Sequence, residues 1–196
     1  VFPTALHIAG TFAIERTLLP AIHEMVSVLK ELEEKNQHVI KIGRTHLQDA
    51  TPVTFAQEVS GWRSSLEHNA TMLANSLTEL RQLAIGGTAV GTGLNASKAY
   101  ERAFIEALNE ETGIQFSGET NKFHALANRD AVVYVSGALK ALAANCMKMA
   151  NDIRWLASGP RSGLGEITLP ANEPGSSIMP GKVNPTQCEA LAMVAV

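Results

Sequence analysis

The chain has 196 residues, of which 45% are hydrophobic and 18% are charged, a composition typical of a globular domain with one sizeable core. Its net charge of -3 and its scattered Lys and Arg residues provide no basic stripe for phosphates, so we expect no nucleic-acid partner. No apolar run reaches the roughly 18 residues of a membrane span and no signal peptide is visible, so we expect no membrane partner.

Long amphipathic helices are predicted in the first half of the chain. Apolar residues recur every three or four positions from Thr4 to Lys35, which predicts a helix that Pro20 is expected to kink. The same periodicity from Val53 to Ala84 predicts a second helix of roughly 45 Å, at about 1.5 Å per residue. Such a length exceeds that of a typical globular helix.

The second half of the chain continues this helical pattern. Residues Ala99 to Glu111 predict a short helix that Gly113 ends, and Asn121 to Ser158 predict a third long helix. Only Val39 to Ile42 and Ile167 to Leu169 look extended, and both segments are short. We therefore expect an all-α fold, an elongated bundle of long helices whose apolar stripes pack in a core or against copies of the same chain.

The cysteines of the chain give little sign of chemistry. Cys146 and Cys188 lack CxxC spacing and a neighbouring histidine pair, so we expect neither a zinc site nor a disulfide framework. A reducing compartment fits this pattern best.

Non-helical segments remain at 41–52, 86–95 and 159–185, and loops on a rigid scaffold often carry function. The first places His46 among polar residues, but a lone histidine is more often structural than catalytic, so the residues alone leave its role open. The second resembles a dinucleotide fingerprint, yet it follows a helix rather than a strand. A flexible connector and part of a small anion site both remain open for it.

The third segment contains the polar stretch from Gly175 to Pro185. A phosphate-binding P-loop is excluded, because five residues rather than four separate its glycines and a valine follows its lysine. The hydroxyls of Ser176 and Ser177, the amide of Asn184 and the charge of Lys182 are what a carboxylate substrate requires. We favour this function over a solvated turn, and the glycines of the segment allow it to move as a lid.

The stretch from Gly175 to Pro185, followed by Thr-Gln-Cys-Glu-Ala, resembles the signature loop of the fumarase/aspartase superfamily in the form found in class II fumarases. Aspartases usually have Ala at the position of Gly181 and lack the Thr-Gln-Cys, which favours fumarase. The resemblance extends over essentially the whole chain, through the segments 43–52, 86–95, 121–123, 150–154 and 159–166.

This resemblance implies an all-α fold, a homotetramer whose active sites combine three subunits, and reversible hydration of fumarate to L-malate without cofactor or metal. Ser176 matches the catalytic base, and His46 matches a catalytic histidine that the family pairs with the position of Glu189. The positions that match substrate-binding residues are Thr45, Ser177, Lys182, Val183 and Asn184.

The resemblance also implies a domain organisation. We expect residues 1–158 to form the central bundle domain and residues 159–196 the mobile loop and the start of the next helix. The sequence begins without Met and lacks polar motifs that the family carries earlier, so we expect a central fragment that is active only within a full-length oligomer. The fumarase of the tricarboxylic acid cycle would be cytoplasmic, or in the mitochondrial matrix of a eukaryote.

Alternatives to this interpretation remain open. Aspartate ammonia-lyase shares the fold and the loop but eliminates ammonia. The alternatives of another class are a helical scaffold without catalytic activity and a fragment that folds but does not turn over substrate. The presence of Ser176, His46, Lys182 and Glu189 argues against the scaffold.

Overall fold

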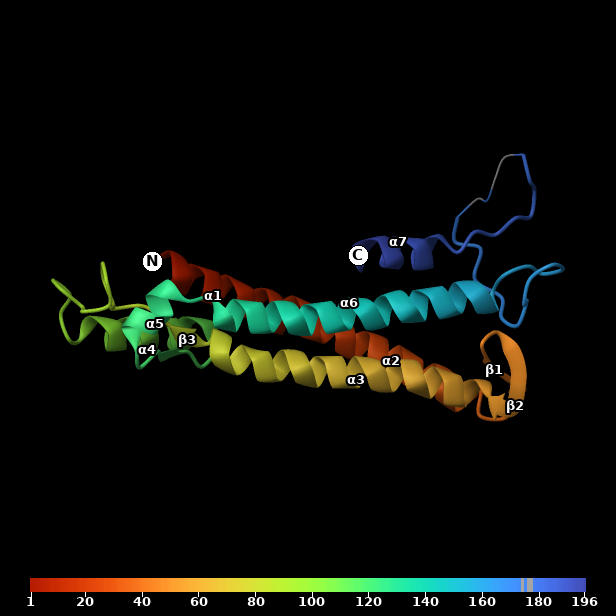
Figure 1. Cartoon of the computed structure of the whole chain (residues 1–196), viewed down its shortest axis with the longest axis horizontal. Coiled ribbons are helices and arrows are strands. Elements are labelled where there is room, and N and C mark those ends of the chain that lie inside the picture. The colour runs from red at the N-terminus through yellow and green to blue at the C-terminus, as the bar shows by residue number, and fades with distance from the viewer. Residues whose placement is uncertain (174, 176–177) are drawn as a thin grey trace. The chain divides into compact units, whose positions relative to one another are not determined.

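The computed structural model describes residues 1–173, 175 and 178–196, and helices make up most of it, as the all-α prediction requires (Figure 1). The chain forms two compact units, Val1–Leu139 and Lys140–Val196, and the boundary falls inside helix α6 (Asp130–Leu156). The expected division after residue 158 stays a prediction. Among the described residues, no helix combines the length and the apolar character that crossing a membrane requires.

The predicted first helix forms as three consecutive helical segments. Helix α1 (Phe2–Ala13) leads into a π-helical turn, η1 (Ile14–Leu18), which continues directly as α2 (Leu19–Lys35). Pro20 has no backbone N–H to donate to the preceding turn, and a widened turn directly before it accommodates this loss. The structure thus has a π-turn directly before Pro20, where the sequence predicted a kink.

Helix α3 (Phe55–Leu80) runs beside α2 and supplies most of the core of the first unit (Figure 1). It begins with a capping box, in which the Gln57 backbone N–H donates to Thr54 Oγ1 and the Thr54 N–H donates to Gln57 Oε1. An ion pair of 2.8 Å between Arg63 and Glu33 joins the two helices at their surface. The hydrophobic side chains of α3 that are completely buried are Val59, Leu66 and Leu73.

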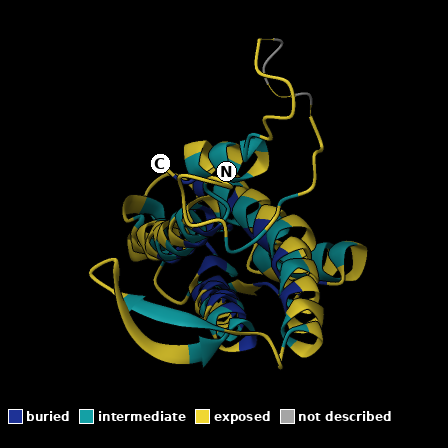
Figure 2. Cartoon of the chain, turned by 90° about the vertical axis from the view of Figure 1, so that its right-hand side faces the viewer, coloured by how far each residue is buried: buried dark blue, intermediate teal, exposed yellow. Residues whose placement is uncertain are grey.

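A β-hairpin connects α2 to α3. Strand β1 (Ile40–Thr45) pairs with the antiparallel strand β2 (Gln48–Thr54), where the sequence had predicted a loop with a short extended start. The register shifts at Gly43, where an added Cβ would lie 2.8 Å from the Thr51 carbonyl oxygen. Figure 2 shows the hairpin in teal and yellow, without fully buried residues.

The opposite end of α3 leads to a small mixed region. The two-residue strand β3 (Gln82–Leu83) pairs in parallel with β4 (Ser117–Gly118), and α4 (Tyr100–Thr112) lies between them in sequence. Gly113 ends α4 in the left-handed conformation, as predicted. The hydrophobic residues that form the core here are Leu83, Ile85, Ile114 and Phe116.

The prediction of one helix from Asn121 to Ser158 is wrong at its start. The structure has α5 (Lys122–Ala127) and a separate α6, because Asn128 adopts an extended conformation between them. The Asn121 side chain caps α5 by accepting from the His124 backbone N–H. Asn and Asp are more favourable at helix caps than in helix interiors. Their presence in this segment therefore favours the end of one helix and the start of another.

The second unit contains the end of α6, the segment 159–185 and helix α7 (Thr186–Val194). The described residues of 159–185 form no helix and no strand beyond an isolated bridge at Met179, so the extended segment expected at 167–169 is not part of a sheet. The expected helix after Pro185 is present.

Candidate functional site

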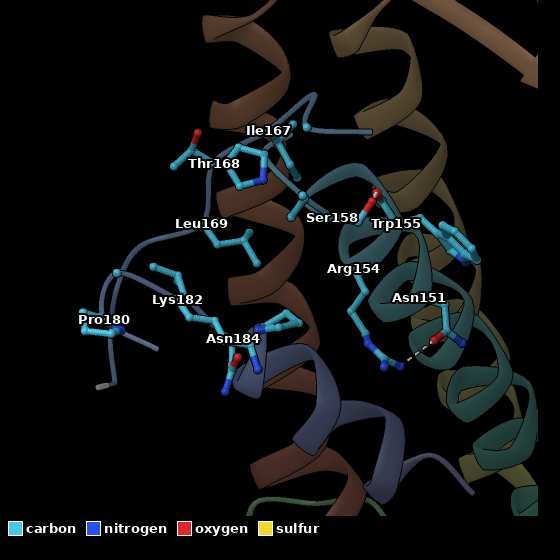
Figure 3. A pocket seen from close by; sticks show the side chains of 17 residues that line it. Asn151, Arg154, Trp155, Ser158, Ile167, Thr168, Leu169, Pro180, Lys182 and Asn184 are labelled. Carbon is cyan, nitrogen blue, oxygen red and sulfur yellow. Dashed lines mark hydrogen bonds between the residues drawn. The ribbon is translucent and has the colours of Figure 1, made fainter. Parts of the chain in front are cut away.

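A pocket of about 950 Å³ lies in the second unit, between the last turns of α6 and the chain that leads into α7 (Figure 3). Trp155, Leu169 and prolines form its apolar wall. Its polar lining residues are Asn151, Arg154, Ser158, Thr168, Lys182 and Asn184. Apolar walls with a few convergent polar groups are typical of small-molecule sites.

Helix α6 contributes a cation and an amide to this pocket. Asn151 and Arg154 are three residues apart and therefore lie on one helix face. Arg154 Nη1 donates a hydrogen bond of 3.2 Å to Asn151 Oδ1 (Figure 3). The segment 150–154 is part of the family resemblance, but no role was predicted for Arg154. Its spacing from Asn151 was the signal present in the sequence.

The loop before α7 contributes the predicted substrate-binding residues. Lys182, Val183 and Asn184 all line the pocket, and Figure 3 shows Lys182 and Asn184 across from the α6 residues. Gly181, directly before them, has φ +80°, a conformation that L side chains rarely adopt. Ser176 and Ser177 lie outside the described residues.

Glu189 lies in the first turn of α7, where one of its carboxylate oxygens is 3.8 Å from Arg154 Nη2. The family resemblance pairs this position with a histidine, whereas within the described part of this chain Glu189 forms an ion pair with Arg154. The neighbouring Cys188 thiol has a raised pKa because of burial, a shift that the charge of Arg154 opposes and that of Glu189 reinforces. The charges of Arg154 and Glu189 therefore both affect the pKa of this thiol in the first turn of α7.

The rim of the pocket is held by a tight return of the chain after α6. Ser158 uses its side chain and its backbone together: its Oγ accepts from the Leu164 N–H at 3.0 Å, and its carbonyl oxygen accepts from the Gly165 N–H at 2.7 Å. An added Cβ at Gly159, whose φ is +109°, would lie 3.0 Å from the Gly163 nitrogen. This part of the pocket therefore depends on glycine.

The predicted residues Thr45 and His46 belong to the first unit, at the tip of the β1–β2 hairpin. Thr45 pairs with Gln48, so His46 and Leu47 form a two-residue turn. Their φ angles of 53° and 60° are those of a type I′ turn, which usually contains Asn and Gly. His46 is thus presented to solvent by a backbone conformation that residues other than glycine adopt only rarely.

A second, smaller pocket of about 210 Å³ in the first unit collects histidines and carboxylates. His124 Nε2 lies 3.0 Å from Asp130 Oδ2, and this hydrogen bond lowers the pKa of the Asp130 carboxyl. Glu119 faces the other ring nitrogen at 4.0 Å. Within the described part of the chain, no group of three His, Cys, Asp or Glu side chains is arranged to hold a metal ion.

The comparisons with known proteins agree with this architecture. A family model described as lyase matches residues 1–196, so the chain belongs to this lyase family. The chain is 59% identical over 195 residues to a class II fumarate hydratase of Helicobacter pylori (strain ATCC 700392 / 26695), covering 100% of this chain and 42% of the relative. It is 62% identical over 193 residues to the class II fumarate hydratase of Bacillus anthracis, covering 98% of this chain and 42% of the relative.

A solved structure supports the same relationship. The chain matches the crystal structure of recombinant class II fumarase from Schistosoma mansoni with a TM-score of 0.97 and 43% sequence identity, over 99% of this chain and 44% of that chain. The resemblance to class II fumarases is thereby confirmed for the whole chain. The chain spans about 42% of the length of the curated relatives named above.

Proposed function

We propose that the chain forms part of an enzyme that reversibly hydrates fumarate to L-malate, as a homotetramer with active sites shared among three subunits. The observation that carries this proposal is the pocket in which Lys182, Val183 and Asn184 lie together, at the positions where the resemblance expects substrate contacts. Similarity to class II fumarate hydratases along the whole chain supports the substrate.

The chemistry explains the need for cations and amides. Removing the proton next to a malate carboxylate leaves an intermediate with additional negative charge on that carboxylate. Donors aimed at such an oxyanion contribute about 3–4 kcal/mol each in comparable sites. The Lys182 ammonium and the Asn184 amide are such donors, and they line one wall of the pocket (Figure 3).

The base and the acid of the proposed mechanism are assigned by the resemblance. Ser176 would remove the proton, which requires a strongly positive and dry environment that Lys182 and closure of the loop would supply. His46 would protonate the departing hydroxide with the help of Glu189, and general acid catalysis of this kind contributes about 10² to 10⁴-fold. In a site shared among subunits, these two residues need not come from one chain.

Assembly with further copies is supported by exposed apolar side chains. Val133 on α6 is 69% exposed, and Met193 and Val194 on α7 are 72% and 84% exposed. Where exposed apolar side chains join into a large patch, the patch usually marks a contact with another protein. The free thiols Cys146 and Cys188 suit the reducing cytoplasm, and the proposed reaction, a step of the tricarboxylic acid cycle, requires no cofactor.

Proton NMR in D₂O tests the proposal most directly. The full-length oligomer is incubated with fumarate, with and without ammonium. Malate deuterated at one position, formed independently of ammonium, is the expected product. Aspartate that forms only with ammonium would assign an aspartate ammonia-lyase instead, and the absence of product in both samples would favour a silent scaffold.

A further inference from the structure

Arg154 is placed to hold the carboxylate of Glu189. Its Nη2 lies 3.8 Å from Glu189 Oε1, and its Nη1 donates to Asn151 Oδ1 at 3.2 Å. A guanidinium is planar and presents its N–H groups in fixed directions. Because Asn151 fixes one of these groups from within α6, the direction of the N–H that faces Glu189 is fixed as well.

The ion pair contributes little to stability. The side chains of Arg154 and Glu189 are 41% and 45% exposed, and ion pairs as exposed as this one are screened by solvent and stabilise a fold only weakly. The pair nevertheless joins the last turns of α6 to the first turn of α7, directly beside the pocket that contains Lys182. Its placement at the pocket is therefore better explained by orientation than by stabilisation.

We infer that Arg154 is a positioning residue that orients Glu189 for its role beside the catalytic histidine, an inference that rests on the proposed function. Contact of Arg154 with Oε1 leaves Oε2 of Glu189 available to accept from an imidazole N–H. When His46 becomes protonated or gives up its proton, the carboxylate then keeps one orientation. In this role Arg154 acts through Glu189 rather than on the substrate.

Site-directed variants of the full-length oligomer test this role through the separation of kcat from KM. Arg154→Gln is expected to lower kcat by about 10–100-fold, the cost of a misplacement of about 1 Å in a catalytic group. KM should change little, because Lys182 and Asn184 are intact. Arg154→Lys keeps the charge without the planar fork and should recover part of kcat, and Asn151→Ala should cause an intermediate loss.

The control variant comes from the same helix. Lys148 on α6 forms an ion pair with Asp152 one turn away and does not line the pocket, so Lys148→Gln removes a comparable cation from a comparable pair. Its kcat should equal that of the wild type. Elution volume and thermal unfolding show for every variant whether the oligomer is intact.

A double-mutant cycle with Glu189→Gln completes the test. If Arg154 acts through Glu189, the double variant should be no slower than Glu189→Gln alone. The inference is overturned if Arg154→Gln lowers kcat by the same factor in the Glu189→Gln background as in the wild type. It is also overturned if Arg154→Gln raises KM and leaves kcat unchanged, which would make Arg154 a substrate contact. Should Arg154→Gln fail to assemble, Arg154→Lys and Asn151→Ala enter the same cycle. An inactive wild type refutes the proposed function, whereas an active wild type with unaffected Arg154 variants refutes only this inference.

Discussion

Replacing Leu47 by glycine should stabilise the β1–β2 hairpin. Leu47 has φ 60° in the type I′ turn, and the left-handed conformation costs an L-residue roughly 1–2 kcal/mol. Glycine adopts it freely but has more conformational entropy to lose, which costs about 0.5–1 kcal/mol. Since the Leu47 side chain is 66% exposed, its removal sacrifices little burial. The net gain should be about 0.5–1 kcal/mol, or roughly two- to fivefold in the opening equilibrium.

Native-state hydrogen exchange measures this opening directly. Amides of β1 and β2 that exchange through local opening should exchange roughly two- to fivefold more slowly in Leu47→Gly, while amides in α3 serve as the internal reference. Leu47→Ala is the matched control, because alanine loses the side chain but keeps the cost of positive φ. Faster exchange in Leu47→Gly, or the same exchange in both variants, would refute the argument from backbone strain.

Other variants test separate parts of the chain. Ser176→Ala in the full-length oligomer should lower turnover by orders of magnitude while substrate still binds in a calorimetric titration; unchanged turnover would remove Ser176 from the base role. Leu73→Ala should cost about 2–5 kcal/mol of unfolding free energy in denaturant titrations, because this side chain is 0% exposed. Thr54→Ala should cost about 1 kcal/mol by the same method, through loss of the α3 cap. His124→Gln should raise the pKa of Asp130 in a carboxyl NMR titration, because the hydrogen bond from His124 lowers that pKa. The lowered pKa stabilises the folded state at a pH above the ordinary pKa of the carboxyl. This stabilisation is lost as the pH falls through the pKa of Asp130 in the folded state.

The long helices could be predicted from the sequence because burial imposes a period of three to four residues on one face. The break at Asn128 could not, since apolar residues resume in phase soon after it and the decisive factors are local caps. The hairpin was missed for another reason. Its turn contains His46 and Leu47 in place of the Asn-Gly pair that usually signals a type I′ turn, and Pro52 within β2 disfavours a strand.

The candidate site could be predicted in part. Lys182, Val183 and Asn184 are adjacent in sequence, so a single turn brings all three to the same pocket. Arg154 lies far from them along the chain, and only the folding of α6 against the return segment makes it a neighbour. The roles of Ser176, His46 and Glu189 remain predictions that rest on the resemblance.

The π-turn at Ile14–Leu18 also sets the angular phase of the first helical segment. Each residue of an α-helix advances the side chains by about 100°, and a π-turn holds one residue more than an α-turn. The buried residues Thr4 and Thr11 of α1 are seven residues apart, as are Ile22 and Leu29 of α2. In an uninterrupted α-helix the spacing from Thr11 to Ile22 would complete about three turns, so the extra residue of the π-turn rotates the buried stripe of α1 by about 100° relative to that of α2. A deletion of one residue there would preserve helical character but rotate the buried face of α1 by about 100° away from the residues that it packs against, so the spacing across the π-turn constrains the chain as strictly as the identity of its core residues.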